Sequence, residues 1–351
     1  MFHDRKFLGG TALGTAALLA APSIIRRART RDAMMTYDQA TIDSAGAFLV
    51  GELERLDPTL NEPLVAYTWS RDIDLREDVS IADEVASFTN SSFAAVGGIQ
   101  PNGKAWAGKD ANAIASLALD IGKTPQPLNL WAMELSWTIP ELESAIRLGR
   151  PVDSQKLEGL NLRLQMDTDE QVYIGDSLLG IPGLVNSPLI SATNVPNGAG
   201  GSPLWAQKTP AEILKDVNTL LNAAWAASGW KVAPTDLRLP PVQFGYIVSQ
   251  TVSTAGNISI LEFLRQNSLS NSINGRPINI QPLKWLVGRG AANADRMMAY
   301  TKDRKYAQFP LVPLQRTPLE YRSLYQLTTY FGRLGQIEFR YPETLGYADG
   351  I

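Results

Sequence analysis

Alternating apolar and polar positions predict strands near both ends of the chain. In residues 69–76 and again in residues 131–137, large apolar side chains alternate with polar ones, as is typical of strands buried on one face. Residues 325–331 and 337–341 alternate in the same way on either side of a turn at 332–335, which favours a hairpin. We expect this hairpin to join the two earlier strands in one sheet.

Between the first two strands lies a long segment with few large apolar residues. Residues 77–127 are polar and rich in glycine, alanine and serine, so they cannot easily build a core of their own. A structureless segment of this length inside a folded protein usually has a binding or assembly role. Because strands flank it on both sides, the sequence predicts an extended two-stranded loop that reaches away from the body.

Capping boxes predict the starts of three helices. The first box, TIPE at 138–141, opens an apolar stripe that is interrupted at 149–151 and then resumes. The second, TPAE at 209–212, opens a helix that Gly229 stops. The third, SILE, lies at 259–262. All three are interpreted as ordinary helices packed on a core.

The middle of the chain alternates between these helices and proline-rich stretches. Residues 237–248 and 278–287 have the apolar content of strands, and with the helices at 209 and 259 they predict an α/β lobe of about a hundred residues. Turn-rich segments at 180–186 and 194–202 precede the lobe. The fold class that follows is α+β, with the lobe inserted between strands from both ends.

Composition excludes several kinds of chemistry. The 351 residues are 44% hydrophobic and include no cysteine, so disulfides, thiolate metal sites and cysteine nucleophiles are excluded. The single histidine, His3, lies in a tail that looks poorly anchored, which leaves almost no imidazole for catalysis or metal binding. We therefore predict no catalytic, cofactor-binding or metal-binding residues, no cofactor, and no enzymatic activity.

Three motifs that suggest chemistry fail on inspection. Residues 103–109 have the spacing of a phosphate-binding loop, but Asp110 stands where a serine or threonine would bind magnesium. Residues 288–293 are one residue short of a dinucleotide fingerprint and lack its strand–helix setting. The carboxylate clusters at 72–78 and 167–170 lack the glycine of a calcium loop, so solvated faces are the favoured interpretation.

The first part of the chain is apolar and basic. Residues 1–31 hold six arginines and lysines against one aspartate, whereas the whole chain has a net charge of −3. The apolar run at 8–21 is too short for a membrane span. Three interpretations stay open: an export signal, a processed leader, or an arm that packs on neighbouring subunits. We favour the arm, in which four arginines are candidate contacts for DNA of any sequence: Arg26, Arg27, Arg29 and Arg31.

Stretches of the C-terminal half carry a family resemblance. Residues 296–300 (RMMAY), 309–318 (FPLVPLQRTP) and 330–343 resemble a family of phage and prophage capsid proteins long catalogued as a domain of unknown function. Residues 180–186, with the pattern GxxGLxN, resemble a stretch seen across such capsids. The order of elements resembles the Hong Kong 97-like fold of tailed-phage major capsid proteins and encapsulin shells. The resemblance covers about residues 35–351.

This resemblance implies a division of the chain. It comprises an N-terminal arm (1–35), the start of a peripheral domain (36–75), an extension loop (76–127), the peripheral domain with a long spine helix (128–199), an axial domain (200–310) and the C-terminal strands of the peripheral domain (311–351). The loop would lie over the neighbouring subunit, which makes Lys104, Trp106 and Lys109 candidate inter-subunit residues. Some relatives lock such loops by a lysine–asparagine isopeptide bond. No acceptor for Lys104 or Lys109 is identifiable, so no cross-link is predicted.

The function implied is that of a major capsid protein. It would self-assemble into pentamers and hexamers of an icosahedral shell around double-stranded DNA, with a portal and scaffolding or decoration proteins as further partners and no membrane. The shell would be assembled in the cytoplasm of a host bacterium and form the virion capsid. Two alternatives remain: an encapsulin-type compartment that packages enzymes, and an exported periplasmic binding protein or enzyme.

Overall fold

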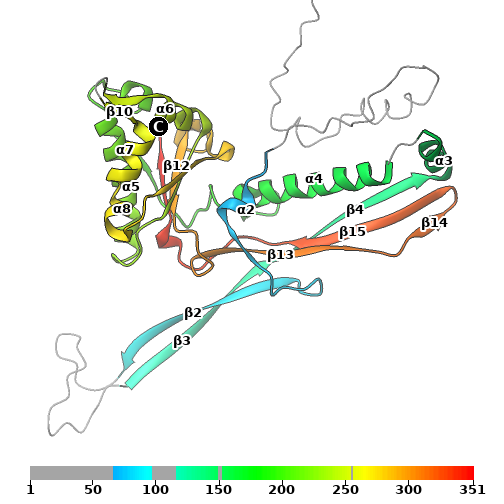
Figure 1. Ribbon diagram of the computed structural model, residues 1–351. Coiled ribbons are helices and arrows are strands. Elements are labelled where there is room, and N and C mark those ends of the chain that lie inside the picture. The colour runs from blue at the N-terminus through cyan, green and yellow to red at the C-terminus, as the bar shows by residue number, and fades with distance from the viewer. Residues whose placement is uncertain (1–65, 97–115, 149–151, 254–255) are drawn as a thin grey trace, which may run out of the picture. The chain divides into compact units, whose positions relative to one another are not determined.

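The computed structural model describes residues 66–96, 116–148, 152–253 and 256–351 (Figure 1). The N-terminal segment, with His3 and the four arginines of the predicted arm, lies outside these residues. So does the stretch 97–115, which contains the predicted inter-subunit residues of the loop.

The first sheet is built from both ends of the described chain. Its central strand is β15 (Tyr325–Leu334), which pairs with β4 (Asn129–Thr138) over ten residue pairs without a shift. On its other edge, β15 pairs with β14 (Glu320–Arg322) and then with β13 (Ala307–Arg316). Strand β13 in turn pairs with β1 (Asp74–Arg76) and β16 (Glu338–Phe339). The prediction of one sheet assembled from both ends is confirmed.

Two details predicted for this sheet are wrong. The strand predicted at 69–76 is a short helix, α2 (Trp69–Asp72), followed by β1 alone. The residues after the turn at 332–335 do not form a hairpin with β15, because β4 and β13 already occupy both of its edges. The chain instead crosses to β13, where Gly335 N donates to Pro310 O (3.0 Å) and β16 pairs with residues 307–308.

Two helices follow β4. The first capping box is present, since Glu141 N donates to Thr138 Oγ1 (3.2 Å) and Thr138 N to Glu141 Oε2 (3.4 Å) at the start of α3 (Ile139–Leu148). Helix α4 (Val152–Tyr173) then runs back along the sheet (Figure 1). Its Leu160 packs on Leu135 and Trp137 of β4, the positions that the alternating pattern assigned to the buried face.

The second sheet has five strands in the order β11-β8-β12-β17-β7. They are β7 (Ala192–Asn194), β8 (Asp236–Leu239), β11 (Asn279–Pro282), β12 (Arg296–Tyr300) and β17 (Gly346–Asp349). Helix α5 (Pro210–Ala227) packs on it and begins with the full capping box predicted at Thr209 and Glu212. Residue Gly229, with φ +67°, lies just past the end of α5, as predicted.

The remaining elements of this lobe only partly follow the predicted strands. Residues 241–249 form helix α6 (Pro241–Ser249) instead of continuing β8, because Pro240 ends the strand and Pro241 opens the helix. Residues 278–287 form β11 and a 3₁₀ turn, η4 (Lys284–Leu286). The others are η3 (Trp205–Gln207), β9 (Thr251–Ser253), β10 (Gly256–Ser259), α7 (Ile260–Asn267), α8 (Leu269–Asn274), η5 (Ala291–Asn293) and η6 (Pro342–Thr344).

The GxxGLxN stretch closes the C-terminal end of α4. A two-stranded turn, β5 (Gly175–Asp176) with β6 (Ile181–Pro182), brings Gly183 against the backbone of Tyr173. A Cβ on Gly183 would lie 2.3 Å from the Tyr173 carbonyl carbon and oxygen, so no other residue fits. Gly183 N donates to Asn186 Oδ1 (2.7 Å), and Asn186 Nδ2 donates to Ile174 O (2.8 Å). The motif therefore binds the last turn of α4 to the following chain.

Replacing Gly183 by alanine should destabilise the protein. Because the added methyl group meets backbone that cannot move aside, Gly183→Ala should lower the free energy of unfolding by about 3 kcal/mol. Gly245→Ala is the matched control, since a Cβ there meets nothing within 4 Å in helix α6 and should raise stability by about 0.5–1 kcal/mol. Urea unfolding of the unassembled subunit measures both. Equal stability of the two variants would contradict the proposed crowding.

Candidate assembly surfaces

The predicted two-stranded loop is present as a β-ribbon. Strand β2 (Val85–Val96) pairs with β3 (Ser116–Pro127) over twelve residue pairs, from Val85 opposite Pro127 to Val96 opposite Ser116. Within the described residues, neither strand pairs with a third strand. The candidate residues Lys104, Trp106 and Lys109 lie between the two strands in sequence, outside the described ranges, so their inter-subunit role stays a prediction.

The two faces of the ribbon differ in character. In an antiparallel pair, directly opposed residues share a face, so Phe93 and Leu119 lie on the same side, as do Leu117 and Ile121. These four side chains are 54–72% exposed. The opposite face carries small and polar residues in this half of the ribbon, including Ser92, Ala118 and Asp120. One face of the ribbon thus presents four large apolar side chains to solvent in its outer half.

Arginine side chains anchor the base of the ribbon to the body. Arg76 Nη1 donates to Ser87 O (3.0 Å) and to Glu338 Oε1 (2.6 Å), and Glu338 is fully buried. Arg333 Nε donates to Ile81 O (2.8 Å) and its Nη1 to Leu128 O (2.9 Å). All of these backbone acceptors lie at or beside the start of the ribbon. These bonds hold the ribbon to the body at its base.

A buried ionic cluster joins the long helix to the second sheet. The Asp72 carboxylate, fully buried, accepts hydrogen bonds from Arg71 Nε (2.6 Å), Arg238 Nε (2.9 Å) and Tyr173 Oη (2.5 Å). Arg238, also fully buried, donates from Nη2 to Asp236 Oδ1 (2.9 Å). The cluster thereby connects α2, the end of α4 and strand β8.

The interpretation of both carboxylate clusters as solvated faces is wrong for one member of each, Asp72 and Asp169. Asp72 is 0% exposed and Asp169 only 1%. Asp169 Oδ2 accepts from Trp285 Nε1 (2.7 Å), and its Oδ1 accepts from the backbone of Thr68 (2.7 Å). Sequence reasoning also missed Arg238. A signal was available, since this arginine stands between two leucines in an apolar strand, and a charge there needs a buried partner.

The buried carboxylates Asp72 and Asp216 have pKa values shifted in opposite directions. Burial alone would raise the pKa of Asp72, but hydrogen bonds from Arg71 and Tyr173 and the charge of Arg238 outweigh it, so this pKa lies below its ordinary value. For Asp216 in α5, burial outweighs the contact with Lys208 and raises the pKa. Asp72 is therefore held as a charged carboxylate.

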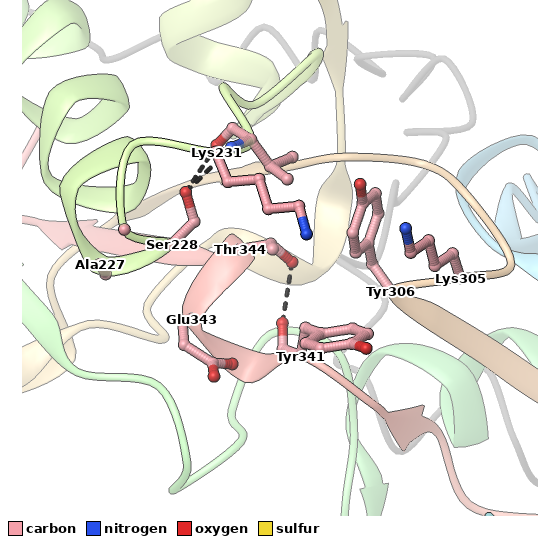
Figure 2. A pocket seen from close by; sticks show the side chains of 10 residues that line it. Ala227, Ser228, Lys231, Lys305, Tyr306, Tyr341, Glu343 and Thr344 are labelled. Carbon is pink, nitrogen blue, oxygen red and sulfur yellow. Dashed lines mark hydrogen bonds between the residues drawn. The ribbon is translucent and has the colours of Figure 1, made fainter. Parts of the chain in front are cut away.

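A shallow pocket of about 270 Å³ lies where the end of α5 meets η6. Figure 2 shows the ammonium groups of Lys231 and Lys305 on either side of the Tyr306 ring. Tyr341 stacks edge-on against Tyr306, with ring centroids 6.0 Å apart, and Glu343 is the one carboxylate of the lining. The lining holds no histidine and no paired carboxylates.

Metal sites and membrane-spanning helices were also sought among the residues that the structure describes. They contain no group of three or more carboxylate and histidine side chains arranged to hold a metal ion. In these same ranges, no helix has the length and apolarity needed to cross a membrane.

The described part of the chain thus presents an anchored ribbon with exposed apolar side chains on one face. The family model for the major capsid protein matches residues 103–351, and the chain belongs to this family. It is a phage shell protein, a component of the virion shell, and a structural protein and not an enzyme. No curated protein sequence matches it.

Solved structures show the same fold at low sequence identity. The capsid of Myoviridae phage XM1 matches with a TM-score of 0.67 and 16% identity, covering 85% of this chain and 97% of that one. The capsid of a native GTA particle matches with a TM-score of 0.52 and 12% identity, covering 88% and 97%. A structure from Mycobacterium phage Che8 gives 0.52 and 8%, covering 86% and 97%. The expected Hong Kong 97-like fold is confirmed.

Removing the Asp72 carboxylate should weaken folding in a pH-dependent way. At pH 7, Asp72→Asn leaves buried Arg238 with only part of its counter-charge and should cost about 3–5 kcal/mol. Because the folded pKa of Asp72 is depressed, its contribution is present above the unfolded pKa of about 4 and is lost as the pH falls through the folded pKa.

Urea unfolding of the unassembled subunit between neutral and acid pH tests this expectation. The wild type should lose stability below about pH 4, and Asp72→Asn should lose less over the same interval. Glu158→Gln, at an exposed position on α4, is the control and should follow the wild type. If the free energy of unfolding falls with pH equally in the wild type and in Asp72→Asn, Asp72 is not the carboxylate whose charge stabilises the fold.

Loosening the ribbon anchor should act mainly on the ribbon. Arg333→Met removes both bonds to the carbonyls of Ile81 and Leu128 without stranding a carboxylate, and should cost about 1–2 kcal/mol in global unfolding. Limited proteolysis should cut residues 77–96 faster in this variant. The control variant Arg322→Met, at an exposed position on β14, should be cut at the wild-type rate. Unchanged cleavage in Arg333→Met would show that Arg333 does not hold the ribbon.

Proposed function

We propose that this chain forms closed rings of five and six copies that tile an icosahedral shell around double-stranded DNA. The observation that carries the proposal is the ribbon, whose apolar face is exposed in the single chain. Four large side chains that are more than half exposed on one face mark a surface that is covered in the working assembly. Family membership indicates that the cover is another shell subunit.

The ribbon is the extension loop of this proposal. Its apolar face, carrying Phe93 and Leu119, packs on the neighbouring copy, and Lys104, Trp106 and Lys109 are the candidate inter-subunit residues of the same loop. Association through such a face is driven by removing apolar surface from water. No cross-link is part of the proposal.

The two sheets correspond to the proposed domains only in part, because β7 and β17 lie in the peripheral ranges but pair into the second sheet. The peripheral domain takes residues 36–75, 128–199 and 311–351, and the axial domain takes 200–310. One apolar cluster lies wholly with the second sheet and its helices, which supports an axial domain, whereas the other also includes Met298, Tyr300 and Tyr347 of that sheet. Strand β17 pairs with β12 in the second sheet, so the last residues of the chain bind the two domains together.

The remaining partners follow from charge and family. The arm of residues 1–35, with Arg26, Arg27, Arg29 and Arg31, contacts packaged DNA through its phosphates without sequence preference. A portal and scaffolding or decoration proteins complete the shell, which is assembled in the cytoplasm of a host bacterium. No observation favours the encapsulin-type alternative over this proposal.

Particle size and the ribbon face test the function together. The full chain should form rings or closed shells, seen by light scattering and negative-stain microscopy. Leu119→Ser should leave the subunit folded, within about 0.5 kcal/mol of the wild type, because Leu119 is exposed. It should nevertheless reduce assembly strongly, since it places a hydroxyl group in the buried contact.

The matched control is Ala118→Ser, which adds the same group on the opposite face of the same strand and should assemble normally. A version that starts at Ala33 shows whether the arm is needed. A wild-type chain that stays a monomer or dimer well above micromolar concentration, in both lengths, would overturn the proposed function.

A further inference from the structure

Three long strand edges are left open in the described part of the chain. Strand β4 pairs with β15 on one side only, and β2 and β3 pair only with each other. The outer strands of the two larger sheets are otherwise short: β1, β14 and β7 have three residues each and β11 has four. An open edge exposes a row of unpaired N–H and C=O groups and is a template for pairing with another strand.

Hydrogen bonds show which backbone groups of β4 point outward. Ile139 N donates to Leu324 O (3.0 Å), in register with the β4–β15 ladder, so the odd-numbered residues of β4 bond to β15. The even-numbered residues therefore direct their N–H and C=O groups away from the sheet. The carbonyl of Ser136, one of them, accepts from Lys156 Nζ (2.9 Å). The outward backbone groups of Leu130, Ala132 and Glu134 pair with no strand of the described ranges.

The same reasoning applies to β2. Leu128 N donates to Glu84 O (3.0 Å), which extends the ribbon ladder by one bonded pair, so odd-numbered residues of β2 face outward. The carbonyl of Ser87 confirms this orientation, because it accepts from Arg76. Beyond Ser87, the backbone groups of Thr89, Ser91 and Phe93 are open to a partner strand.

Neither the β2 edge nor the β4 edge carries the usual protection against pairing. Strand β2 has no charged residue and no proline in twelve positions, and β4 has one charge, Glu134, in ten. Neither ladder contains a bulge. Strand β3, by contrast, carries Pro125 and Pro127 at outward positions, with Lys123 beside them. The chain thus protects the base of the β3 edge, at residues 123–127, and gives the β2 edge no such protection.

We propose that the outer edge of β2 in one copy pairs, backbone to backbone, with the outer edge of β4 in the next copy. The two edges cannot meet within one chain, because β2 already lies against β3 and β4 continues the line of β3 beyond Leu128. Each copy therefore offers one edge and accepts another. Such a head-to-tail contact uses two different surfaces and propagates around a ring. The inference rests on the proposed function and specifies its subunit contact.

Amide hydrogen exchange in assembled particles tests the pairing directly. The outward amides of Ala132 and Glu134 in β4, and of Thr89 and Ser91 in β2, should exchange at least about tenfold more slowly in particles than in dissociated subunits. The inward amides of Trp131 and Met133 are the internal control, since β15 already protects them in the single subunit. Equal exchange of the outward amides in both states would overturn the proposal.

Proline variants test the head-to-tail arrangement. Ala132→Pro and Ser91→Pro each remove an outward N–H, as the native prolines of β3 do, so both subunits should fold. Neither alone should close rings, whereas an equimolar mixture should form pairs through the one intact β2 and the one intact β4. Ala132→Thr and Ser91→Thr keep the N–H and should assemble. Ring closure by either proline variant, or pairing of one variant with itself, would refute the arrangement.

The outcomes separate this inference from the proposed function. If wild-type particles form but their outward amides stay unprotected, the proposed pairing of β2 with β4 is refuted and the proposed shell function is not. Protection of β4 without protection of β2 would assign the edge of β4 to another segment, such as residues 1–65, and would also overturn the proposal. A wild-type chain that forms no particles at all would instead count against the shell function.

Discussion

The Asp72 carboxylate is the interaction on which the arrangement of the described body depends. It is completely buried, and its partners come from the neighbouring residue, the end of α4 and strand β8. The Tyr300 hydroxyl of β12 also donates to the Asp72 carbonyl (2.8 Å). A buried charge that loses one partner is costly, so elements on opposite sides of Asp72 have little freedom to shift separately. The ribbon anchor at Arg76 begins four residues later in the chain.

Elements defined by local signals could be predicted from the sequence. Strand β4 follows from strict alternation, and α5 from its capping box and terminal glycine. The ribbon follows from its lack of apolar residues between two strands. Elements defined by distant partners could not be predicted. The pairing of β17 with β12 brings together residues about fifty positions apart, and no local pattern near Gly346 indicates the partner sheet.

The candidate site divides in the same way. That the loop serves assembly could be inferred from composition, but its apolar face appears only once the register places Phe93 opposite Leu119. Asp72 was misjudged because its principal counter-charge, Arg238, lies 166 residues away in sequence. A run of carboxylates is ordinarily solvated, and only the fold shows that Arg238 of the second sheet binds Asp72.

Strands β3 and β4 follow one another with only Leu128 between them, and this continuity has a mechanical consequence. A force pulling along the ribbon acts on β4 along its own length. It therefore loads the ten residue pairs between β4 and β15 together, in shear, rather than peeling them apart one at a time. Shared loading of this kind resists tension far better than sequential opening. The chain is thus suited to bear strain that arrives through its ribbon and to spread it into the sheet behind.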